Sequence, residues 1–214
     1  MTTASRDIIL RRIRDALADV PADETSEHLP APRDYRRSHA EDDTRALFAE
    51  RVADYRAHVV TATPDAARET IARLLARRGP RSLAVPPGFP EELLPEGPWE
   101  RLSEPLSVAD LEAADGVLTT AAVGIAETGT IILDTGPGQG RRALTLLPDY
   151  HLCVVRDHQI VGDVPDALVL LDPARPLTFV SGPSATSDIE LDRVEGVHGP
   201  RTLDVLIITQ EQSA

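Results

Sequence analysis

The chain of 214 residues has a single cysteine, Cys153, contains no lysine or asparagine, and carries a net charge of -13 at pH 7. One cysteine excludes an internal disulfide and the thiolate sets of iron–sulfur clusters or structural zinc, and the absence of lysine excludes Schiff-base, pyridoxal-phosphate and Walker A chemistry. The negative excess lies in residues 81–214, which disfavours nucleic acid and anionic membranes as partners, and no apolar run could span a bilayer, so we expect a soluble cytoplasmic protein.

The first forty residues predict a helical arm followed by a linker. From residue 5 to residue 20, apolar side chains recur at helical spacing, with arginines and aspartates on the other face; the apolar positions are Ile9, Ile13, Ala16, Leu17 and Val20. Residues 21–40 combine prolines with charged side chains and show no period. We therefore expect an arm and linker over residues 1–40 and one domain over residues 41–214. The arm would dock on that domain or, in a homo-oligomer, on a neighbouring subunit.

Strand and helix patterns alternate along the rest of the chain. Helices are predicted over residues 41–58, 64–79, 107–114 and 164–171, the third of which starts with a capping box of Ser107 and Asp110. Strands are predicted over residues 59–62, 82–85, 117–121, 130–133, 152–155, 177–180 and 205–208. Such alternation favours an α/β fold with a largely parallel sheet.

A lone glutamate stands among small residues at the entry to the strand predicted over residues 130–133. The sequence there is Gly124-Ile125-Ala126-Glu127-Thr128-Gly129-Thr130, and its glycines would let backbone approach a ligand closely. With apolar neighbours, Glu127 would serve as a base or a nucleophile. The alternative is a hairpin turn in which this glutamate faces water.

Two adjacent arginines, Arg141 and Arg142, follow a glycine-rich stretch over residues 134–140. The glycines lack the strand, Gly-x-Gly-x-x-Gly, helix order of a dinucleotide site. Paired guanidinium groups offer bidentate donors to a carboxylate or a phosphate, which makes the arginines a candidate anion site. The alternative is that they pair with Asp134, with Asp149 or with a helix carboxyl end.

A third polar stretch, residues 181–200, lies between two predicted strands. Loops in this position are held by a rigid sheet and often carry sites. Ser181, Ser184 and Thr186 would present hydroxyl and backbone N–H groups to an anion. Asp188 would either join them or cap a short helix.

Two of the six histidines are candidates for a site. His198 is framed by glycine and proline, and His151 starts a predicted strand. A triad of Ser184, His198 and Asp188 can be drawn, but no nucleophile-elbow pattern supports it. No histidine spacing typical of zinc is present, so no metal is expected.

These motifs, in this order, resemble the lactate-utilization protein C family, whose members carry a LUD domain. The matching residues are Ala126-Glu127-Thr128-Gly129-Thr130, Arg142, Leu146-Leu147-Pro148, His151, Ser181-Gly182-Pro183-Ser184, Thr186, Asp188-Ile189-Glu190 and Gly196-Val197-His198-Gly199-Pro200. The resemblance covers about residues 41–210. It implies a Rossmann-like α/β sheet sandwiched by helices, similar to the CoA-transferases and sugar-phosphate isomerases.

The resemblance also implies a function. It suggests a three-protein bacterial system that oxidises L-lactate to pyruvate, in which two partner proteins hold the iron–sulfur clusters and this chain holds no cofactor. We therefore expect a non-redox subunit or accessory protein with a pocket for a small carboxylate or phosphate, faced by Glu127 and His198 as catalytic residues. The expected ligand-binding residues are Thr128, Gly129, Arg142, Ser181, Ser184, Thr186 and Asp188.

Two alternatives stay open at this point. The first is a stand-alone enzyme, similar to CoA-transferases or cyclo-ligases, acting on an acyl-CoA, a folate or a nucleotide. For this activity Glu127 resembles the catalytic glutamate of CoA-transferases, although Thr128-Gly129 follows it where those enzymes have Asn-Gly. The second is a scaffold that only holds the two iron–sulfur proteins.

Overall fold

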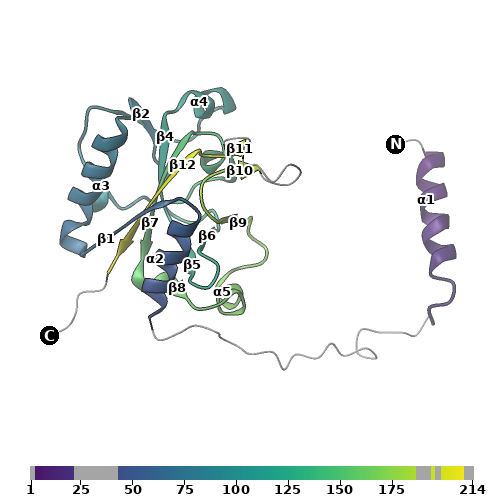
Figure 1. The fold of residues 1–214 in the computed structure, drawn as a ribbon. Coiled ribbons are helices and arrows are strands. Elements are labelled where there is room, and N and C mark those ends of the chain that lie inside the picture. The colour runs from purple at the N-terminus through teal and green to yellow at the C-terminus, as the bar shows by residue number, and fades with distance from the viewer. Residues whose placement is uncertain (1–2, 22–42, 187–193, 196–198, 210–214) are drawn as a thin grey trace. The chain divides into compact units, whose positions relative to one another are not determined.

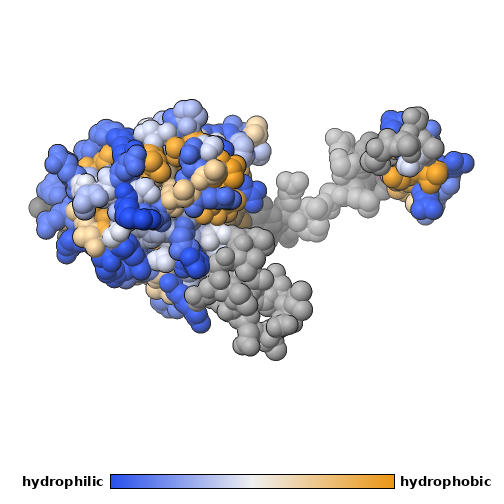
Figure 2. All heavy atoms as spheres, turned by 90° about the horizontal axis from the view of Figure 1, so that it is seen from above, coloured by the Kyte–Doolittle hydropathy of each residue, from blue (hydrophilic) through white to orange (hydrophobic). Residues whose placement is uncertain are grey.

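The computed structural model of the chain (Figure 1) describes residues 3–21, 43–186, 194–195 and 199–209. The chain divides into two compact units, Met1–Arg36 and Arg37–Ala214. In the first unit, helix α1 (Thr3–Ala16) confirms the predicted helix but ends at Ala16 rather than at residue 20. Apolar side chains lie along one side of it and are about half exposed (Figure 2); they are Ile8, Ile9, Ile13 and Leu17.

In the described part of the second unit, four α-helices lie where the sequence predicts them. They are α2 (Thr44–Asp54), α3 (Pro64–Arg78), α4 (Val108–Ala113) and α5 (Val164–Leu170). The Asp43 carboxylate accepts a hydrogen bond from the Ala46 N–H at 2.9 Å, and α3 stops at Gly79, whose φ of 66° is left-handed. The predicted capping box of Ser107 and Asp110 is confirmed, with distances of 2.8 and 3.1 Å. None of the helices described is long and apolar enough to cross a membrane.

A six-stranded parallel sheet, the main sheet, forms the centre of this unit. In spatial order its strands are β1 (His58–Ala62), β12 (Thr202–Ile208), β7 (Tyr150–Arg156), β4 (Gly116–Thr120), β2 (Ser82–Ala84) and β3 (Glu100–Leu102). Every neighbouring pair is parallel; Val205 of β12, for example, lies between Val59 of β1 and Cys153 of β7. The predicted parallel sheet is therefore confirmed. The sequence does not predict β3, because two of its three residues are charged.

A second sheet has four strands. Their spatial order is β8 (Ile160–Val161), β5 (Val123–Ile125), β6 (Thr130–Leu133) and β9 (Thr178–Val180). Strands β5 and β6 form an antiparallel hairpin, and β6 also pairs antiparallel with β9. The remaining short elements are β10 (Ala185–Thr186), β11 (Val194–Glu195) and the 3₁₀ turns η1 (Glu91–Leu93), η2 (Arg142–Thr145) and η3 (Asp157–Gln159).

Both faces of the main sheet are buried (Figure 1). On one face lies α3, and the side chains buried there include Ile71, Leu74, Leu118, Leu152 and Leu206. On the other face lie α2 and the second sheet, and the side chains buried there include Phe48, Val52, Ile131, Cys153 and Val155. Because successive residues of a strand point to opposite faces, β7 contributes to both layers. The predicted fold class, an α/β sheet sandwiched by helices, is confirmed, and the specific likeness to CoA-transferases stays a prediction.

A carboxylate is buried inside the main sheet. Asp204 of β12 is fully buried and accepts hydrogen bonds from Arg78, at 2.7 and 3.2 Å, and from the Tyr150 hydroxyl, at 2.9 Å. Burial and the nearby carboxylate raise the pKa of Tyr150, so its hydroxyl stays protonated and can donate. A second arginine, Arg77, lies 3.5 Å from Asp204. Since both arginines belong to the last turn of α3, the cluster ties the end of this helix to the main sheet.

We predict that Asp204→Ala lowers the free energy of unfolding by about 3 kcal/mol, because it leaves the partners of a buried ion pair without their acceptor. Chemical denaturation of the purified chain measures the change. Glu91→Ala is the control, since it removes an ion pair with Arg101 in which Glu91 is 69% exposed. That control should cost no more than about 0.5 kcal/mol, and equal losses in the two variants would contradict the role given to Asp204.

Candidate functional site

Two cavities lie at opposite ends of the main-sheet strands. The amino-end cavity, of about 650 Å³, lies where β7 and β12 begin; its lining includes Arg142, Thr145, His151, Ser181, Ser184 and Leu203. The carboxyl-end cavity, of about 520 Å³, lies where β4 and β7 end; its lining includes Thr120, Asp134, Gln139, Arg156, Gln159 and Arg175. Both volumes fall in the range of roughly 300–1,000 Å³ that small-molecule sites occupy.

Arg142 gives the amino-end cavity a positive charge. It is the first residue of η2, its side chain is exposed, and it has no ion-pair partner among the residues that the structure describes. Its neighbour Arg141 is engaged instead, since it lies 3.1 Å from the Glu104 carboxylate and also donates to the Leu106 carbonyl. Arg141 is therefore paired, with Glu104 rather than with the partners that the sequence offered, whereas Arg142 has no ion-pair partner within the described ranges.

The acids that the sequence offers as partners for these arginines bind elsewhere. Asp134 pairs with Arg175 at 2.7 Å, and the Asp149 carboxylate accepts a hydrogen bond from Arg201 at 3.0 Å. Both pairings join segments far apart in the sequence, which is why residue order alone did not reveal them.

A row of hydroxyl groups leads from the β5–β6 turn to the amino-end cavity. Thr128 Oγ1 donates to Thr130 Oγ1 at 2.8 Å, and Thr130 Oγ1 lies 2.8 Å from Ser181 Oγ. Thr130 is buried, so the two outer hydroxyls satisfy the polar atom between them. Ser181 lines the cavity, and Thr128 therefore acts on it through one intervening side chain.

Three of the predicted ligand-binding residues meet on this one cavity: Arg142, Ser181 and Ser184. The loop that carries Ser184 is anchored, because the Ser184 N–H donates to the Pro200 carbonyl at 2.8 Å. The backbone of Thr186 belongs to β10, opposite Val194 of β11. Asp188 and His198 lie outside the described residues, so their predicted roles stay predictions.

His151 is the other polar side chain on the amino-end cavity that the sequence singled out. It is 1% exposed, and its Nε2 lies 2.8 Å from Thr119 Oγ1 on the neighbouring strand. Burial lowers the pKa of His151 to about 4, so its imidazole is neutral at physiological pH. The residue lines the cavity, which places a neutral imidazole beside any ligand bound there.

Glu127 lies in the turn of the β5–β6 hairpin and is exposed. Its N–H donates to the Gly162 carbonyl at 3.1 Å, which fixes the turn against the loop after β8. Glu127 thus lies in a hairpin turn and faces water, as in the second interpretation of this motif, and is not enclosed by apolar side chains. Within the described residues, the lining of the amino-end cavity does not include Glu127, Thr128 or Gly129.

The glycines of the predicted motifs accommodate helix α2. Gly129 has a φ of 57°, and a Cβ there would come within 2.6 Å of the Arg51 backbone. Gly182 has a φ of 85°, and a Cβ there would come within 2.5 Å of the Tyr55 Cβ. Both positions combine a left-handed backbone with a close neighbour, so only glycine fits. The sequence suggested that Gly129 lets the backbone approach a ligand, whereas in the structure the backbone at both glycines approaches helix α2.

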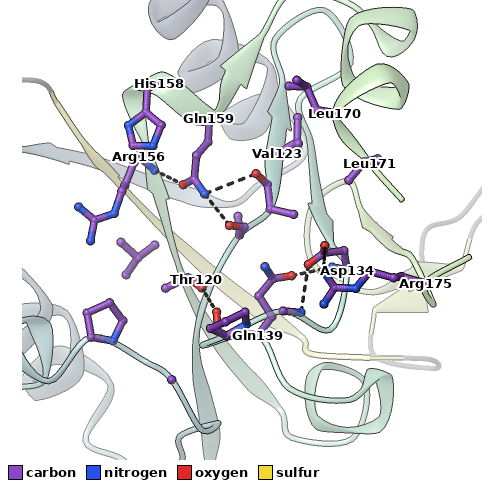
Figure 3. A pocket seen from close by; sticks show the side chains of 17 residues that line it. Thr120, Val123, Asp134, Gln139, Arg156, His158, Gln159, Leu170, Leu171 and Arg175 are labelled. Atoms are coloured by element: carbon purple, nitrogen blue, oxygen red, sulfur yellow. Dashed lines mark hydrogen bonds and ion pairs between the residues drawn. The ribbon is translucent and has the colours of Figure 1, made fainter. Parts of the chain in front are cut away.

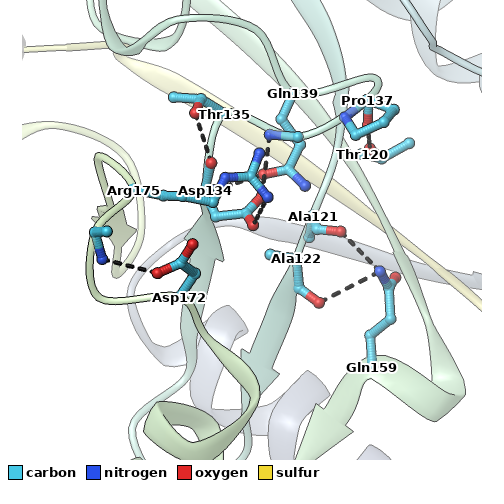
Figure 4. Close-up of polar contacts among 12 residues, drawn as sticks. Thr120, Ala121, Ala122, Asp134, Thr135, Pro137, Gln139, Gln159, Asp172 and Arg175 are labelled. Carbon is cyan, nitrogen blue, oxygen red and sulfur yellow. Dashed lines mark hydrogen bonds and ion pairs between the residues drawn. The ribbon is translucent and has the colours of Figure 1, made fainter.

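The sequence does not predict the carboxyl-end cavity. Its polar side chains include Asp134 and Gln139 from the loop after β6, Gln159 from η3 and Arg175 from the loop after α5 (Figure 4), together with Arg156 at the end of β7. Gln139 Oε1 accepts the Asp134 N–H at 2.6 Å, and Asp134 pairs with Arg175. One signal could have found this site: Arg156 directly follows a buried apolar run, at the strand end where α/β sheets bind ligands.

Metal-binding side chains do not cluster in the described parts of the chain: no group of three or more His, Cys, Asp or Glu residues could hold an ion there. Cys153 is fully buried, and burial raises the pKa of its thiol to about 12. The nearby Thr119 Oγ1 donates to its sulfur at 3.6 Å. A thiol with this pKa stays protonated at neutral pH and offers no thiolate.

We predict that stability falls as the pH drops from 6.5 towards 4, in part through His151. The unfolded chain protonates this histidine near its ordinary pKa of 6.5, whereas the folded chain resists until about 4, so acid favours unfolding within that window. Above pH 6.5, this difference in the pKa of His151 contributes its full amount, about 3 kcal/mol, to the free energy of unfolding. Urea denaturation across this range should show a smaller slope for His151→Gln than for the wild type. Equal slopes would contradict the assignment.

Comparison with known proteins identifies relatives. The LUD domain family matches residues 108–208. The lactate utilization protein C of Deinococcus radiodurans is 48% identical over 166 residues, covering 75% of this chain and 77% of that protein. The lactate utilization protein C of Bacillus subtilis is 30% identical over 120 residues, covering 52% of this chain and 50% of that protein. A crystal structure of a DUF162 family protein from Deinococcus radiodurans matches 77% of this chain and 96% of that chain, with a TM-score of 0.66 and 40% identity. The chain therefore belongs to the lactate utilization protein C family, as its sequence motifs predict.

Proposed function

We propose that this chain takes part in bacterial lactate utilization as a non-redox subunit or accessory protein, beside two iron–sulfur proteins that oxidise L-lactate to pyruvate. The observation that carries this proposal is the 48% identity, over 166 residues, to a protein named lactate utilization protein C. The single cysteine supports the division of labour, because this chain alone cannot supply four thiolates to a cluster. Electrons would then pass through the partner proteins.

Within this role, the amino-end cavity binds a small carboxylate or phosphate anion. Arg142 has the planar donor arrangement that matches such a group, and the hydroxyls of Ser181 and Ser184 lie on the same cavity. His151 adds a neutral imidazole, which brings no charge to the cavity. Lactate and pyruvate combine a carboxylate with a hydroxyl and a keto oxygen respectively, so either fits this set of groups.

The remaining predicted residues extend the proposal. His198 would face the ligand as a catalytic residue, and Thr186 and Asp188 would complete the loop that begins at Ser184. Glu127, which the described lining of the cavity does not include, would have to reach the ligand from the exposed hairpin turn to act as the second catalytic residue. Thr128 and Gly129 would support the site from the hairpin turn, since Thr128 reaches Ser181 through the hydroxyl of Thr130.

We predict that Arg142→Gln weakens the binding of L-lactate or pyruvate roughly tenfold to a hundredfold, the usual worth of a hydrogen bond to a charged group. A titration of the purified chain, followed through its melting temperature, measures the loss. A strain with this substitution should grow more slowly on L-lactate and normally on glucose. Arg101→Gln is the matched control, because it removes the same charge from an exposed pair outside both cavities.

The outcomes separate the role from the site. Normal growth on L-lactate of a strain without the gene would overturn the proposed role, and so would failure of the two iron–sulfur proteins to copurify with the tagged chain. Equal binding by Arg142→Gln and Arg101→Gln would overturn the site alone. Glu127→Gln and His198→Ala test the catalytic roles in the same growth assay, and unimpaired growth of both would remove those residues from the site.

A further inference from the structure

The carboxyl-end cavity stands at the place where open α/β sheets bind ligands. It lies beyond the last residues of two adjacent parallel strands, Thr120 of β4 and Arg156 of β7. It shares no lining residue with the amino-end cavity within the described part of the chain. A ligand of this cavity is therefore independent of the function proposed above for the amino-end cavity.

Arg156 gives this cavity a net positive charge. The residue is half-buried at the end of β7, and its guanidinium has no hydrogen-bond or ion-pair partner among the described residues. The other two charged residues of the lining, Asp134 and Arg175, pair with each other at 2.7 Å. A half-buried guanidinium without a partner favours a carboxylate or a phosphate beside it. The positive cavity thus lies in the part of the chain that holds the negative excess.

Gln139 supplies a second point of recognition. Its side chain is 5% exposed, and its Oε1 is used by the Asp134 N–H at 2.6 Å. Its Nε2 has no hydrogen-bond partner among the described residues, and the residue lines the cavity (Figure 3). This nitrogen is not among the buried unpaired side-chain atoms of the described residues, so it is open to the cavity and can donate to an oxygen of a ligand.

An apolar wall completes the cavity. Val123, Val154 and Leu171 line it, and Leu170, which is 61% exposed, stands at its edge (Figure 3). Because Val123, Val154 and Leu171 are at most 8% exposed, the apolar surface open to a ligand belongs mainly to Leu170, which an apolar group would cover and a bare ion would not. A volume of about 520 Å³ also exceeds what a small inorganic ion needs.

The loop over residues 134–140 holds the polar groups in place. Its Gly138 accepts a hydrogen bond from the Thr120 N–H and donates one to the Pro87 carbonyl, each at 2.8 Å. Thr135 adopts a left-handed φ of 61°, which is strained for a residue other than glycine. At Gly136 a Cβ would come within 3.1 Å of Gln139 Nε2, so glycine leaves room for the amide. Fixing the donors before binding reduces the ordering cost of binding.

We propose that the carboxyl-end cavity binds an anionic small molecule with an apolar body. Arg156 contacts its carboxylate or phosphate, the amide of Gln139 donates to one of its oxygens, and its apolar part covers Leu170 at the edge of the cavity.

The test uses phenyl phosphate and benzoate, which share a ring and differ in the anionic group, with inorganic phosphate as the ion without a ring. Titrations of the full chain are followed by NMR, where the side-chain amide signal of Gln139 reports on this cavity and not on Arg142. We expect phenyl phosphate or benzoate to shift this signal, and inorganic phosphate to bind roughly tenfold more weakly because it buries no ring.

Two variants test the residues. Arg156→Met keeps an apolar stem and removes the charge, and should weaken binding roughly tenfold or more. Gln139→Glu keeps an acceptor for the Asp134 N–H but places a negative charge against the ligand, and should also weaken binding, observed through the backbone amide of Gly136. Arg101→Met is the matched control and should bind as the wild type does.

Three results would overturn the proposal. The first is that neither ring compound shifts the Gln139 signal of the wild type. The second is that Arg156→Met and Arg101→Met, each folded by circular dichroism, bind equally well. The third is that inorganic phosphate binds as tightly as phenyl phosphate, which would show that the ligand needs no apolar body. Should Arg156→Met fail to fold, undiminished binding by Gln139→Glu would count against the proposal in the same way.

Discussion

Burial of both faces of the main sheet is the constraint on which the rest of this structure depends. A parallel sheet needs a covering layer on each side, and here α3 provides one while α2 and the second sheet provide the other. The one buried acidic residue of that sheet among the described residues, Asp204, is held by the last turn of α3 and by Tyr150. Both cavities lie at the ends of the strands of this covered sheet.

The sequence predicted what depends on local pattern and missed what depends on long-range pairing. The apolar run before Arg156 and the capping box at Ser107 are local, and both elements form as expected. Of the second sheet, the sequence predicted the strands β6 and β9 but neither β5 and β8, which are too short for a period to show, nor the pairing of these distant segments. At the amino-end cavity, residue type singled out Arg142 and the two serines, which line one cavity and whose binding roles stay predictions. The polar groups of the other cavity come from strand ends and loops far apart in the sequence, and no spacing along the chain reveals that they meet.

Strand β7 relates the two cavities, because it begins beside one and ends beside the other. His151 is its second residue and Arg156 its last, so the two side chains are separated by a buried stretch of strand about 17 Å long. One end offers a neutral imidazole on the cavity that Arg142 also lines, and the other offers the guanidinium of Arg156 and the amide of Gln139. The two proposed sites are thus chemically distinct.

Gly129 and Gly182 belong to motifs whose glycines would ordinarily be taken to mark a ligand-binding loop, yet both make room for the carboxyl end of α2. Glycine is therefore required at both positions by the packing of this helix. A protein in which this helix were shorter or displaced would be free to vary at both positions while keeping its cavity intact. Conversely, two chains that share these glycines share the packing position of this helix. The shared glycines then describe the architecture and carry no information about what either protein binds.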